Sequence, residues 1–391
     1  MHEPLGDDCE HCASPAGPGG PSAGTLSRRR FLIGAGAAAL GTGLVTTRAS
    51  FGAPGSGALV VIFLRGGADG LSIIVPGDDP DLLAARPKIA VPSSVLLPLD
   101  RGFGLHPTLA PLHELWTRGQ FTAVPAVSTT DVSRSHFQAQ DCRERGGSAT
   151  GTVEGWLDRV LDQLGPGTPF RAVAAASTLP RALAGLYAGI DHPVAADVST
   201  TLAGLDVTFA MTAAGYQPGA TYPQGEFGEG LAQLAQLLKA DVGLRVACVD
   251  VSSWDHHANL GTVDGGEMKN SLTMLGGALA AFAADLGPRF DEVTVVAMTE
   301  FGRRVAENAN GGTDHGHGAA VLLLGGGLAG GTIHGNWPGL SPAVLDQGDV
   351  PGANDYRDVL GEVVTRRLGL GADALAAVFP EHRVQPLGVT R

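Results

Sequence analysis

Apolar residues along the chain follow two patterns in turn, one typical of strands and one of helices. Continuous apolar runs are typical of strands buried on both faces of a sheet; they occur at 58–70, 121–127, 244–252, 291–302 and 319–327. Apolar residues at three- and four-residue spacing predict helices with one buried face; they occur at 105–119, 227–240, 262–286 and 355–369. A further helix is expected over 133–145, beginning near Ser133 or Ser135. The alternation predicts an α/β fold, a sandwich with a mostly parallel central sheet.

The start of the chain departs from this pattern and is typical of an export signal. Leu26–Ser50 combines paired arginines, an apolar run of about 16 residues and a stretch of small residues. The run is short for a membrane span, and Ser27–Leu32 has the form of a twin-arginine signal. We therefore expect a leader at 1–53, cleaved near Ala49 or Ala53, with the twin-arginine translocase as partner. The mature protein would be periplasmic or extracellular, without a stable membrane span; an N-terminal anchor is the alternative.

The remaining residues, 54–391, are expected to form a single domain. Within it, residues 165–226 are rich in Ala, Gly and Thr and show little periodicity, so we interpret them as an insertion or lid. Hydrophobic residues make up 44% of the chain, enough for a sizeable core. The net charge of −13 and the absence of a basic patch argue against nucleic acid as a partner. Cys142 and Cys248 remain after the leader, and a disulfide between them is an open alternative.

Polar residues with metal-binding chemistry flank the predicted strands. They lie at four places, three of them after a buried run and one before a buried run. The full set is Asp69, Asp255, His256, His257, Glu300, Asp314, His315 and His317. Because ligands collect at the carboxyl ends of strands in open α/β sheets, these side chains could meet at one edge. A mixed Asp/His set suits zinc, manganese or iron better than calcium. The alternative for each histidine is a solvated or hydrogen-bonded side chain.

Ser135 is the candidate nucleophile. It lies at the expected start of a helix, where a hydroxyl commonly serves only as an N-cap. Helix amides at this position would instead help to hold an anion, and Arg134 and His136 could bind that anion or shuttle protons. Arg65 and Arg303 are candidates to clamp an oxyanion, or are simply surface charges.

Several motifs together resemble a family of exported bacterial proteins, the domain of unknown function 1501 family. They are "FLRGGADGLSIIVP", "SRSHFQAQD", "WDHHANL", "TEFGRRVAENANGGTDHGHG", "GGTIHGNWPGL" and "DYRDVL", and they extend over about residues 58–370. That family is more distantly similar to the alkaline phosphatase and sulfatase superfamily. The resemblance implies a three-layer α/β/α fold, one or two metals and a nucleophile at a helix N-terminus. It also implies hydrolysis of phosphate or sulfate esters.

The same resemblance suggests roles for particular residues. Asp69 would match a metal ligand after the first strand, and Ser135 the nucleophile. The later motifs would supply the other ligands, at Asp255, His257, Asp314 and His315 or His317. The choice of histidine stays open, because His256 adjoins His257 and His317 lies two residues after His315. Two features depart from the superfamily. Glu300-Phe301 stands where an Asp-His pair is usual, and the sulfatase signature is missing around Ser135.

The sequence therefore predicts an exported, metal-dependent hydrolase of phosphate-type esters, with sulfate esters less favoured. The cofactor expected is a divalent metal, zinc or manganese, in unknown number. The predicted site has Ser135, Arg134 and His136 as catalytic residues, and as metal ligands Asp69, Asp255, His257, Glu300, Asp314 and His315. The substrate would be a small molecule or a polymer carrying the ester. A non-catalytic, metal-stabilised binding or assembly protein of the cell envelope is the main alternative, and a mutase or transferase is a third.

Overall fold

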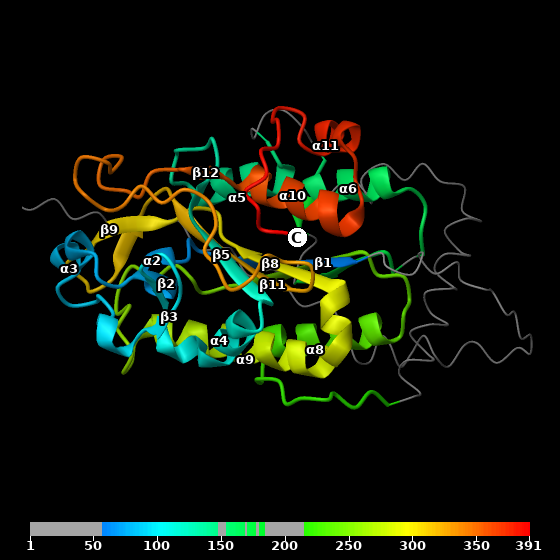
Figure 1. The fold of residues 1–391 in the computed structure, drawn as a ribbon, viewed down its shortest axis with the longest axis horizontal. Helices are drawn as coiled ribbons and strands as arrows, with labels where there is room; N and C mark the ends of the chain where they lie inside the picture. The colour runs from blue at the N-terminus through cyan, green and yellow to red at the C-terminus, as the bar shows by residue number, and fades with distance from the viewer. Residues whose placement is uncertain (1–56, 148–153, 169, 177–179, 184–214) are drawn as a thin grey trace, which may run out of the picture. The chain divides into compact units, whose positions relative to one another are not determined.

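A seven-stranded central sheet organises the fold (Figure 1). The computed structural model describes residues 57–147, 154–168, 170–176, 180–183 and 215–391, all within one compact unit, Thr47–Arg391. The sheet order is β12-β5-β11-β8-β1-β7-β6. The strand bounds are β1 Ala58–Leu64, β5 Phe121–Ser128, β6 Ala172–Ala175, β7 Val246–Val251, β8 Val293–Met298, β11 Ala319–Gly325 and β12 Asn354–Asp355. Neighbouring strands run parallel except around β11, which is antiparallel to β5 and β8.

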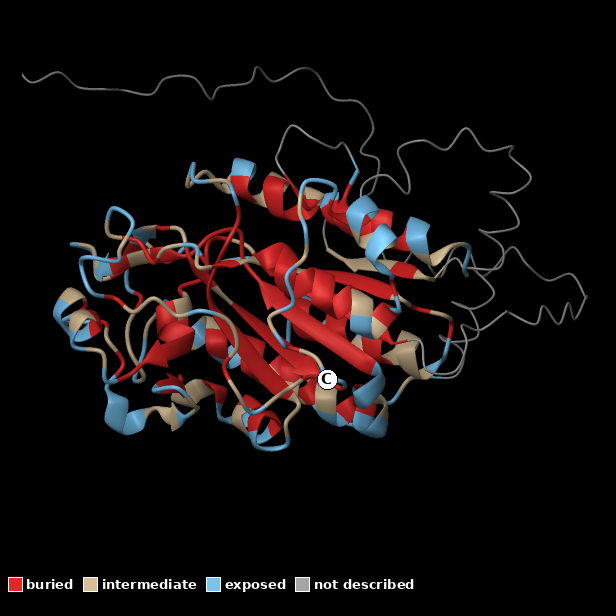
Figure 2. Ribbon diagram, turned by 45° about the horizontal axis from the view of Figure 1, so that its top comes forward, coloured by how far each residue is buried: buried red, intermediate tan, exposed pale blue. Residues whose placement is uncertain are grey.

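Helices cover both faces of this sheet, so the architecture is a three-layer α/β/α sandwich (Figure 1). One layer contains α4 Ala110–Thr117, α8 Glu226–Lys239 and α9 Glu267–Leu286. The other contains α5 His136–Arg145, α6 Trp156–Leu164, α10 Tyr356–Leu368 and α11 Ala372–Val378. Strand β1 shows why its sequence is apolar throughout. Val60 and Ile62 pack in the first core, whereas Val61 and Phe63 pack in the second, because successive strand side chains point to opposite faces. Figure 2 shows the resulting buried sheet between partly exposed helices.

Smaller elements cluster beside the sheet. A three-stranded sheet has the order β2-β4-β3, with β2 at Ile74–Pro76, β3 at Leu97–Pro98 and β4 at Phe103–Leu105. A two-stranded sheet pairs β9 Arg303–Glu307 with β10 Thr313–His315. Two short helices are α2 Gly70–Ile73 and α3 Pro80–Ala85, and the 3-10 turns are η1 Ser93–Val95, η2 Pro107–Leu109, η3 Arg181–Leu183 and η4 Gly287–Glu292.

The direction of β11 brings the candidate residues to one edge. The loops that follow β1, β5, β7 and β8 lie at the carboxyl ends of these strands, which point the same way. Because β11 runs in the opposite direction, the segment that precedes it lies at that same edge. Residues 311–318 therefore lie beside the loops that follow the other strands. A purely parallel sheet would have placed them at the opposite edge.

The predicted fold class is confirmed, with differences in detail. The segment 165–226, interpreted as an insertion or lid, contains β6, an edge strand of the central sheet that its alanine-rich sequence concealed. Residues 184–214 of that segment and the predicted leader 1–53 lie outside the described residues. Cys142 and Cys248 are both free thiols, so the disulfide left open above is not formed. None of the described helices is long and apolar enough to cross a bilayer.

Candidate metal centre

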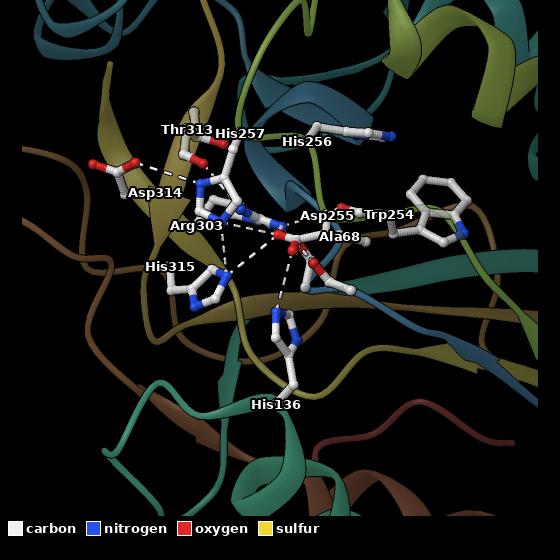
Figure 3. A network of polar contacts seen from close by, with 12 residues as sticks. Ala68, His136, Trp254, Asp255, His256, His257, Arg303, Thr313, Asp314 and His315 are labelled. Atoms are coloured by element: carbon white, nitrogen blue, oxygen red, sulfur yellow. Dashed lines mark hydrogen bonds and ion pairs between the residues drawn. The ribbon is translucent and has the colours of Figure 1, made fainter. Parts of the chain in front are cut away.

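Three histidines and an aspartate from different loops converge at the sheet edge (Figure 3). Asp255 and His257 follow β7, His136 opens α5, and His315 ends β10. The ligand atoms of His136, Asp255 and His315 all lie within 4.8 Å of one another. His257 joins them, because its Nε2 lies 3.1 Å from Asp255 Oδ1 and 2.9 Å from His315 Nε2. Metal-binding residues that are distant in the sequence are thus neighbours in space.

The protonation of His315 is set by its backbone partner. Its Nδ1 lies 3.0 Å from the carbonyl oxygen of Arg134. A carbonyl can only accept, so Nδ1 carries a proton and donates. In the neutral ring Nε2 then presents a lone pair, 3.2 Å from Asp255 Oδ1. Burial lowers the pKa of His315, which favours this neutral, ligand-ready form.

His136 is held in the same way by Glu300. The His136 Nδ1 donates to Glu300 Oε1 at 2.8 Å, and its Nε2 faces Asp255 Oδ2 at 3.4 Å. Glu300 also accepts from the amide of Gly66 and from Gln140. Burial would raise the pKa of Glu300, but the bonds from His136 and Gln140 lower it to about 2. The carboxylate is therefore ionised and directs the Nε2 of His136 towards the cluster.

His257 has a carboxylate behind it as well. Its Nδ1 lies 3.5 Å from Asp314 Oδ1, while Asn308 holds the same oxygen at 3.0 Å. The neighbouring His256 turns away from the cluster (Figure 3), and its Nε2 contacts the carbonyl of Ser253 at 3.0 Å. His257 is therefore the histidine of this pair that faces the cluster. Each of the three imidazoles has Nδ1 engaged with an acceptor and Nε2 directed into the cluster.

The donor atoms fit a transition-metal ion. Neighbouring donors are separated by 2.9 to 3.4 Å. Ligands bound to one tetrahedral zinc at its usual bond lengths lie about 3.3 Å apart. Three imidazole nitrogens and one carboxylate also match the ligand types that zinc and its neighbours prefer. The site is thus a candidate metal centre formed by His136, Asp255, His257 and His315.

The charge around the cluster points to a divalent ion. Three carboxylates lie in or directly behind it, those of Asp255, Glu300 and Asp314, and one guanidinium, that of Arg303, contacts Asp255. Three negative charges and one positive charge leave two negative charges. A divalent cation neutralises this excess, and it also removes the conflict between lone pairs that face one another.

Arg303 joins the loops that carry the site. Its side chain is fully buried and donates to Asp255 Oδ1 at 2.5 Å. Its other bonds are to backbone carbonyls, those of Gly66, Gly67, Trp254 and Thr313. Sequence reasoning left it as an oxyanion clamp or a surface charge, and the structure corrects both alternatives. Arg65 is likewise engaged, in ion pairs with Glu144 and Asp250.

Glycines permit the close approach of these loops. Gly66 has a φ of +124°, and a Cβ there would lie 2.5 Å from the amide nitrogen of Asp255. A Cβ on Gly312 would lie 2.3 Å from the carbonyl carbon of His257. Larger residues would separate the β1 and β10 segments from the loop after β7. The glycines near the histidines therefore have a packing role.

Three of the predicted metal ligands have other roles. Asp69 is buried, and its two carboxylate oxygens accept from Arg86 and Ser72. It is therefore a structural ion-pair partner rather than a member of the cluster. Glu300 and Asp314 lie behind His136 and His257, so they position ligands instead of facing the centre. The sequence order of the superfamily motif could not reveal this, because it does not specify which oxygen contacts which donor.

The predicted catalytic residues are only partly placed as expected. Ser135 is the N-cap of α5 and its side chain makes no capping bond, so its role as nucleophile stays a prediction. Arg134 was expected to bind an anion, but its guanidinium pairs with the buried Asp349. Its contribution to the centre is its carbonyl. His136, expected to bind an anion or shuttle protons, faces the cluster as a candidate ligand.

The rings of His317 and His334 face backbone carbonyls instead of the cluster. His317 Nε2 lies 3.3 Å from the carbonyl of Thr129, and His334 Nε2 lies 2.8 Å from that of Ala329, in the loop after β11. Sequence reasoning also missed the part played by Gln140, Asn308 and Asp349. Gln140 could have been suspected, since it follows His136 by four residues and so shares its helix face.

The chain was compared with solved structures. Among those found is the C-terminal periplasmic domain of EcEptC from Escherichia coli, in complex with Zn, with 11% identity over 71% of this chain and 76% of that one and a TM-score of 0.36. The lipoteichoic acid synthase LtaP from Listeria monocytogenes has 11% identity over 83% and 77%, with a TM-score of 0.37. The PsFucS1 sulfatase from Pseudoalteromonas sp. has 12% identity over 82% and 69%, with a TM-score of 0.38. Likeness at this level carries no conclusion about activity.

The sequence comparisons concern the second half of the chain. No curated protein is significantly similar to the chain. A family profile matches residues 191–354. This stretch carries Asp255, His257 and His315 together with the carboxylates behind them, whereas Ser135 and His136 lie outside it. The matched family is described as "Protein of unknown function (DUF1501)", and the match confirms the resemblance that the motifs indicated.

Proposed function

We propose that this protein is a metal-dependent hydrolase of phosphate-type esters that acts outside the cytoplasm. The observation that carries the proposal is the convergence of three imidazole Nε2 atoms on Asp255, each ring fixed from behind by an acceptor. Fixed ligands of this kind are typical of metal sites in which outer partners orient the imidazoles. The leader predicted at 1–53 is the basis for proposing export by the twin-arginine route.

His136, Asp255, His257 and His315 would hold the ion, and zinc or manganese suits them best. Such an ion supplies Lewis-acid chemistry, polarising an ester oxygen and favouring ionisation of a nearby hydroxyl. Glu300 and the carbonyl of Arg134 keep Nδ1 of their histidines protonated, so the Nε2 atoms remain available. These contacts would preserve the geometry of the site through the reaction.

Ser135 would act as the nucleophile from the N-terminus of α5. The first amides of a helix have no intrahelical partner and favour negative charge, so they would stabilise the charge that develops on the phosphoryl oxygens. The Ser135 oxygen would bond to phosphorus as the bond to the departing alcohol oxygen breaks. The serine proton passes to solvent and the alcohol takes one up. A water then cleaves the serine ester and restores the hydroxyl.

The test combines metal analysis with a substrate panel. The mature chain, beginning at Pro54, would be purified without chelators and its metal content measured by mass spectrometry. Hydrolysis of an aryl phosphate monoester, an aryl phosphodiester and an aryl sulfate would then be compared with and without added zinc or manganese. We expect close to one metal per chain and turnover of a phosphate ester. A metal-free protein inert on all three esters would refute the proposal, and a metal-bound but inert one would favour the non-catalytic alternative.

A further inference from the structure

A second polar pocket lies beside the candidate metal centre. It is a small hollow, with about 270 Å³ of empty space that includes open solvent, and it is lined by Asp131, Arg134, Phe301, His317, Asp346 and Asp349. Phe301 separates it from the cluster, because its ring packs 4.9 Å from that of His136 and 4.7 Å from that of His315, measured between centroids. Arg134 belongs to both, since its carbonyl contacts His315 and its side chain lines the pocket. The pocket therefore adjoins the metal centre across the ring of Phe301.

Asp349 presents an unsatisfied oxygen there. Its side chain is fully buried, and Oδ2 accepts from Arg134 Nε at 2.9 Å. Oδ1 has no hydrogen-bond partner among the described residues, and Arg304 Nε approaches it only to 3.6 Å. Burial raises the pKa of Asp349 in spite of both arginines. A buried carboxylate oxygen without a donor is costly, so a donor from outside the chain is the expected complement.

His317 adds a second acceptor to the same pocket. Its Nε2 faces the carbonyl of Thr129, which can only accept, so Nε2 carries the proton. Nδ1 of the neutral ring is then an acceptor, and it too is buried without a partner among the described residues. Two residues that line one small hollow therefore each carry a buried acceptor without a hydrogen-bond donor among the described residues.

The lining chemistry selects among ligands. Three carboxylates and one guanidinium line the pocket, so an anionic group would be repelled. A metal ion is not indicated, because the ligand atoms that line this pocket do not lie close to one another. Among the described residues, the group with mutually close ligand atoms is His136, Asp255 and His315. A hydroxyl or an ammonium group has the donors that both acceptors lack.

We propose that this pocket is a specificity subsite, in which Asp349 and His317 accept hydrogen bonds from a hydroxyl or ammonium group on the substrate. The inference rests on the proposed function, and it narrows the substrate class to phosphate-type esters of polyols or amino alcohols. Arg134 would link the two sites by holding Asp349 with its guanidinium and His315 with its carbonyl.

Three matched diesters test the proposal. Each is a 4-nitrophenyl phosphodiester whose second ester group is propyl, 3-hydroxypropyl or 3-aminopropyl. The three substrates therefore differ only in the hydrogen-bond donor at the end of the chain. We expect kcat/KM for the hydroxyl or amino ester to exceed that for the propyl ester by about tenfold or more, the effect of one hydrogen bond to a buried charged acceptor. The ratio of kcat/KM for the 3-hydroxypropyl ester to that for the 3-aminopropyl ester distinguishes recognition of a hydroxyl from recognition of an ammonium group.

Variants assign the preference to the pocket. Asp349→Asn and His317→Phe should each bring the ratio of donor ester to propyl ester close to one, whereas Asp264→Asn, an exposed acid elsewhere, should leave the ratio unchanged. The ratio is read within each variant, so a partial loss of stability does not obscure it. Using His317→Phe keeps the test valid if Asp349→Asn does not fold, because it leaves the ion pair with Arg134 in place.

The outcomes separate this inference from the proposed function. Turnover of all three diesters without preference would overturn the subsite and leave the hydrolase intact. If no diester is turned over, the panel of monoester, diester and sulfate described above decides the hydrolase proposal, and saturation-transfer NMR with propane-1,3-diol and 3-aminopropan-1-ol decides the subsite. Binding of either compound that is lost in both variants would support it. Equal signals from propan-1-ol, or none from any of the three compounds, would refute it.

Discussion

The Nε2 atoms of His257 and His315 lie 2.9 Å apart, although 58 residues separate them in the chain. Asp314 engages the other nitrogen of His257 and the carbonyl of Arg134 engages that of His315. With both Nδ1 atoms acting as donors, two neutral rings would direct lone pairs at one another. A proton on one ring, or a cation between the two rings, would remove this conflict. Asp255 and His136 adjoin the same point, which favours a metal ion over a proton.

Substituting His257 should remove most of the metal-dependent stability. A ligand that binds at one hundred times its dissociation constant stabilises the wild type by about 2.7 kcal/mol. If His257→Ala weakens binding at least one hundredfold, the same concentration contributes only about 0.4 kcal/mol. The measurement is the shift in urea unfolding midpoint on adding zinc. His256→Ala is the matched control, because its ring faces Ser253 and Ser271; it should lower stability yet keep the zinc response.

Ser135→Ala should abolish turnover without loss of metal or fold. The hydroxyl makes no capping bond, so its removal leaves no helix amide newly unpaired. Turnover should fall by at least about 1000-fold if the serine forms the covalent intermediate. The control is Ser133→Ala, whose hydroxyl accepts from the amide of Ser135 and bonds to Asp131. Retained turnover in Ser135→Ala would assign the nucleophile to water instead.

Acid should weaken the protein partly through Asp69. Burial would raise its pKa, but the Arg86 guanidinium and the Ser72 hydroxyl lower it below the usual value. A depressed folded-state pKa contributes stability that is complete above the unfolded pKa of about 3.9 and is lost as the pH falls below it. The free energy of unfolding, measured by urea titration, should therefore fall as the pH is lowered below about 4.

The double variant Asp69→Asn/Arg86→Met should flatten that part of the pH dependence. It removes both charges, whereas Asp69→Asn alone leaves Arg86 buried without its partner and should cost about 3–5 kcal/mol. The folded double variant should also retain zinc, because Asp69 does not face the cluster. A pH profile that matches the wild type, or loss of zinc from the folded variant, would contradict this role for Asp69.

The layers of the fold were predictable because burial on both faces leaves a plain record in the sequence. Continuous apolar runs identified β1, β5, β7, β8 and β11, and three- and four-residue spacing identified the larger helices. Strand β6 was missed because four alanine- and valine-containing residues at a sheet edge give no such run. The β9–β10 hairpin was not predicted, since its glycines and histidines are not typical of strands.

The ligand set was predictable only as a group of residue types. His257 and His315 were predicted and both lie in the cluster, but the roles of Glu300 and Asp314 depend on which atom each carboxylate contacts. Sequence pattern carries no information on such pairings. Asp69 was misassigned for a related reason. Its partner Arg86 lies 17 residues away, with nothing in the spacing to connect them.

Arg303→Lys should destabilise the protein more than a change of one cation for another suggests. The guanidinium serves five acceptors in three loops, namely four backbone carbonyls and Asp255. A lysine ammonium has three donors from one point, so at least two acceptors would be left without a bond. Each buried acceptor costs about 1–3 kcal/mol, which predicts a loss of roughly 2–6 kcal/mol in urea unfolding. Arg118→Lys, at an exposed position, should change stability by less than about 0.5 kcal/mol.

Because Arg303 also ties Asp255 to the β1 loop, the folded Arg303→Lys variant should bind zinc more weakly than Arg118→Lys does. A variant with wild-type stability and zinc affinity would show that solvent satisfies these carbonyls, and that the loops keep their positions without the guanidinium.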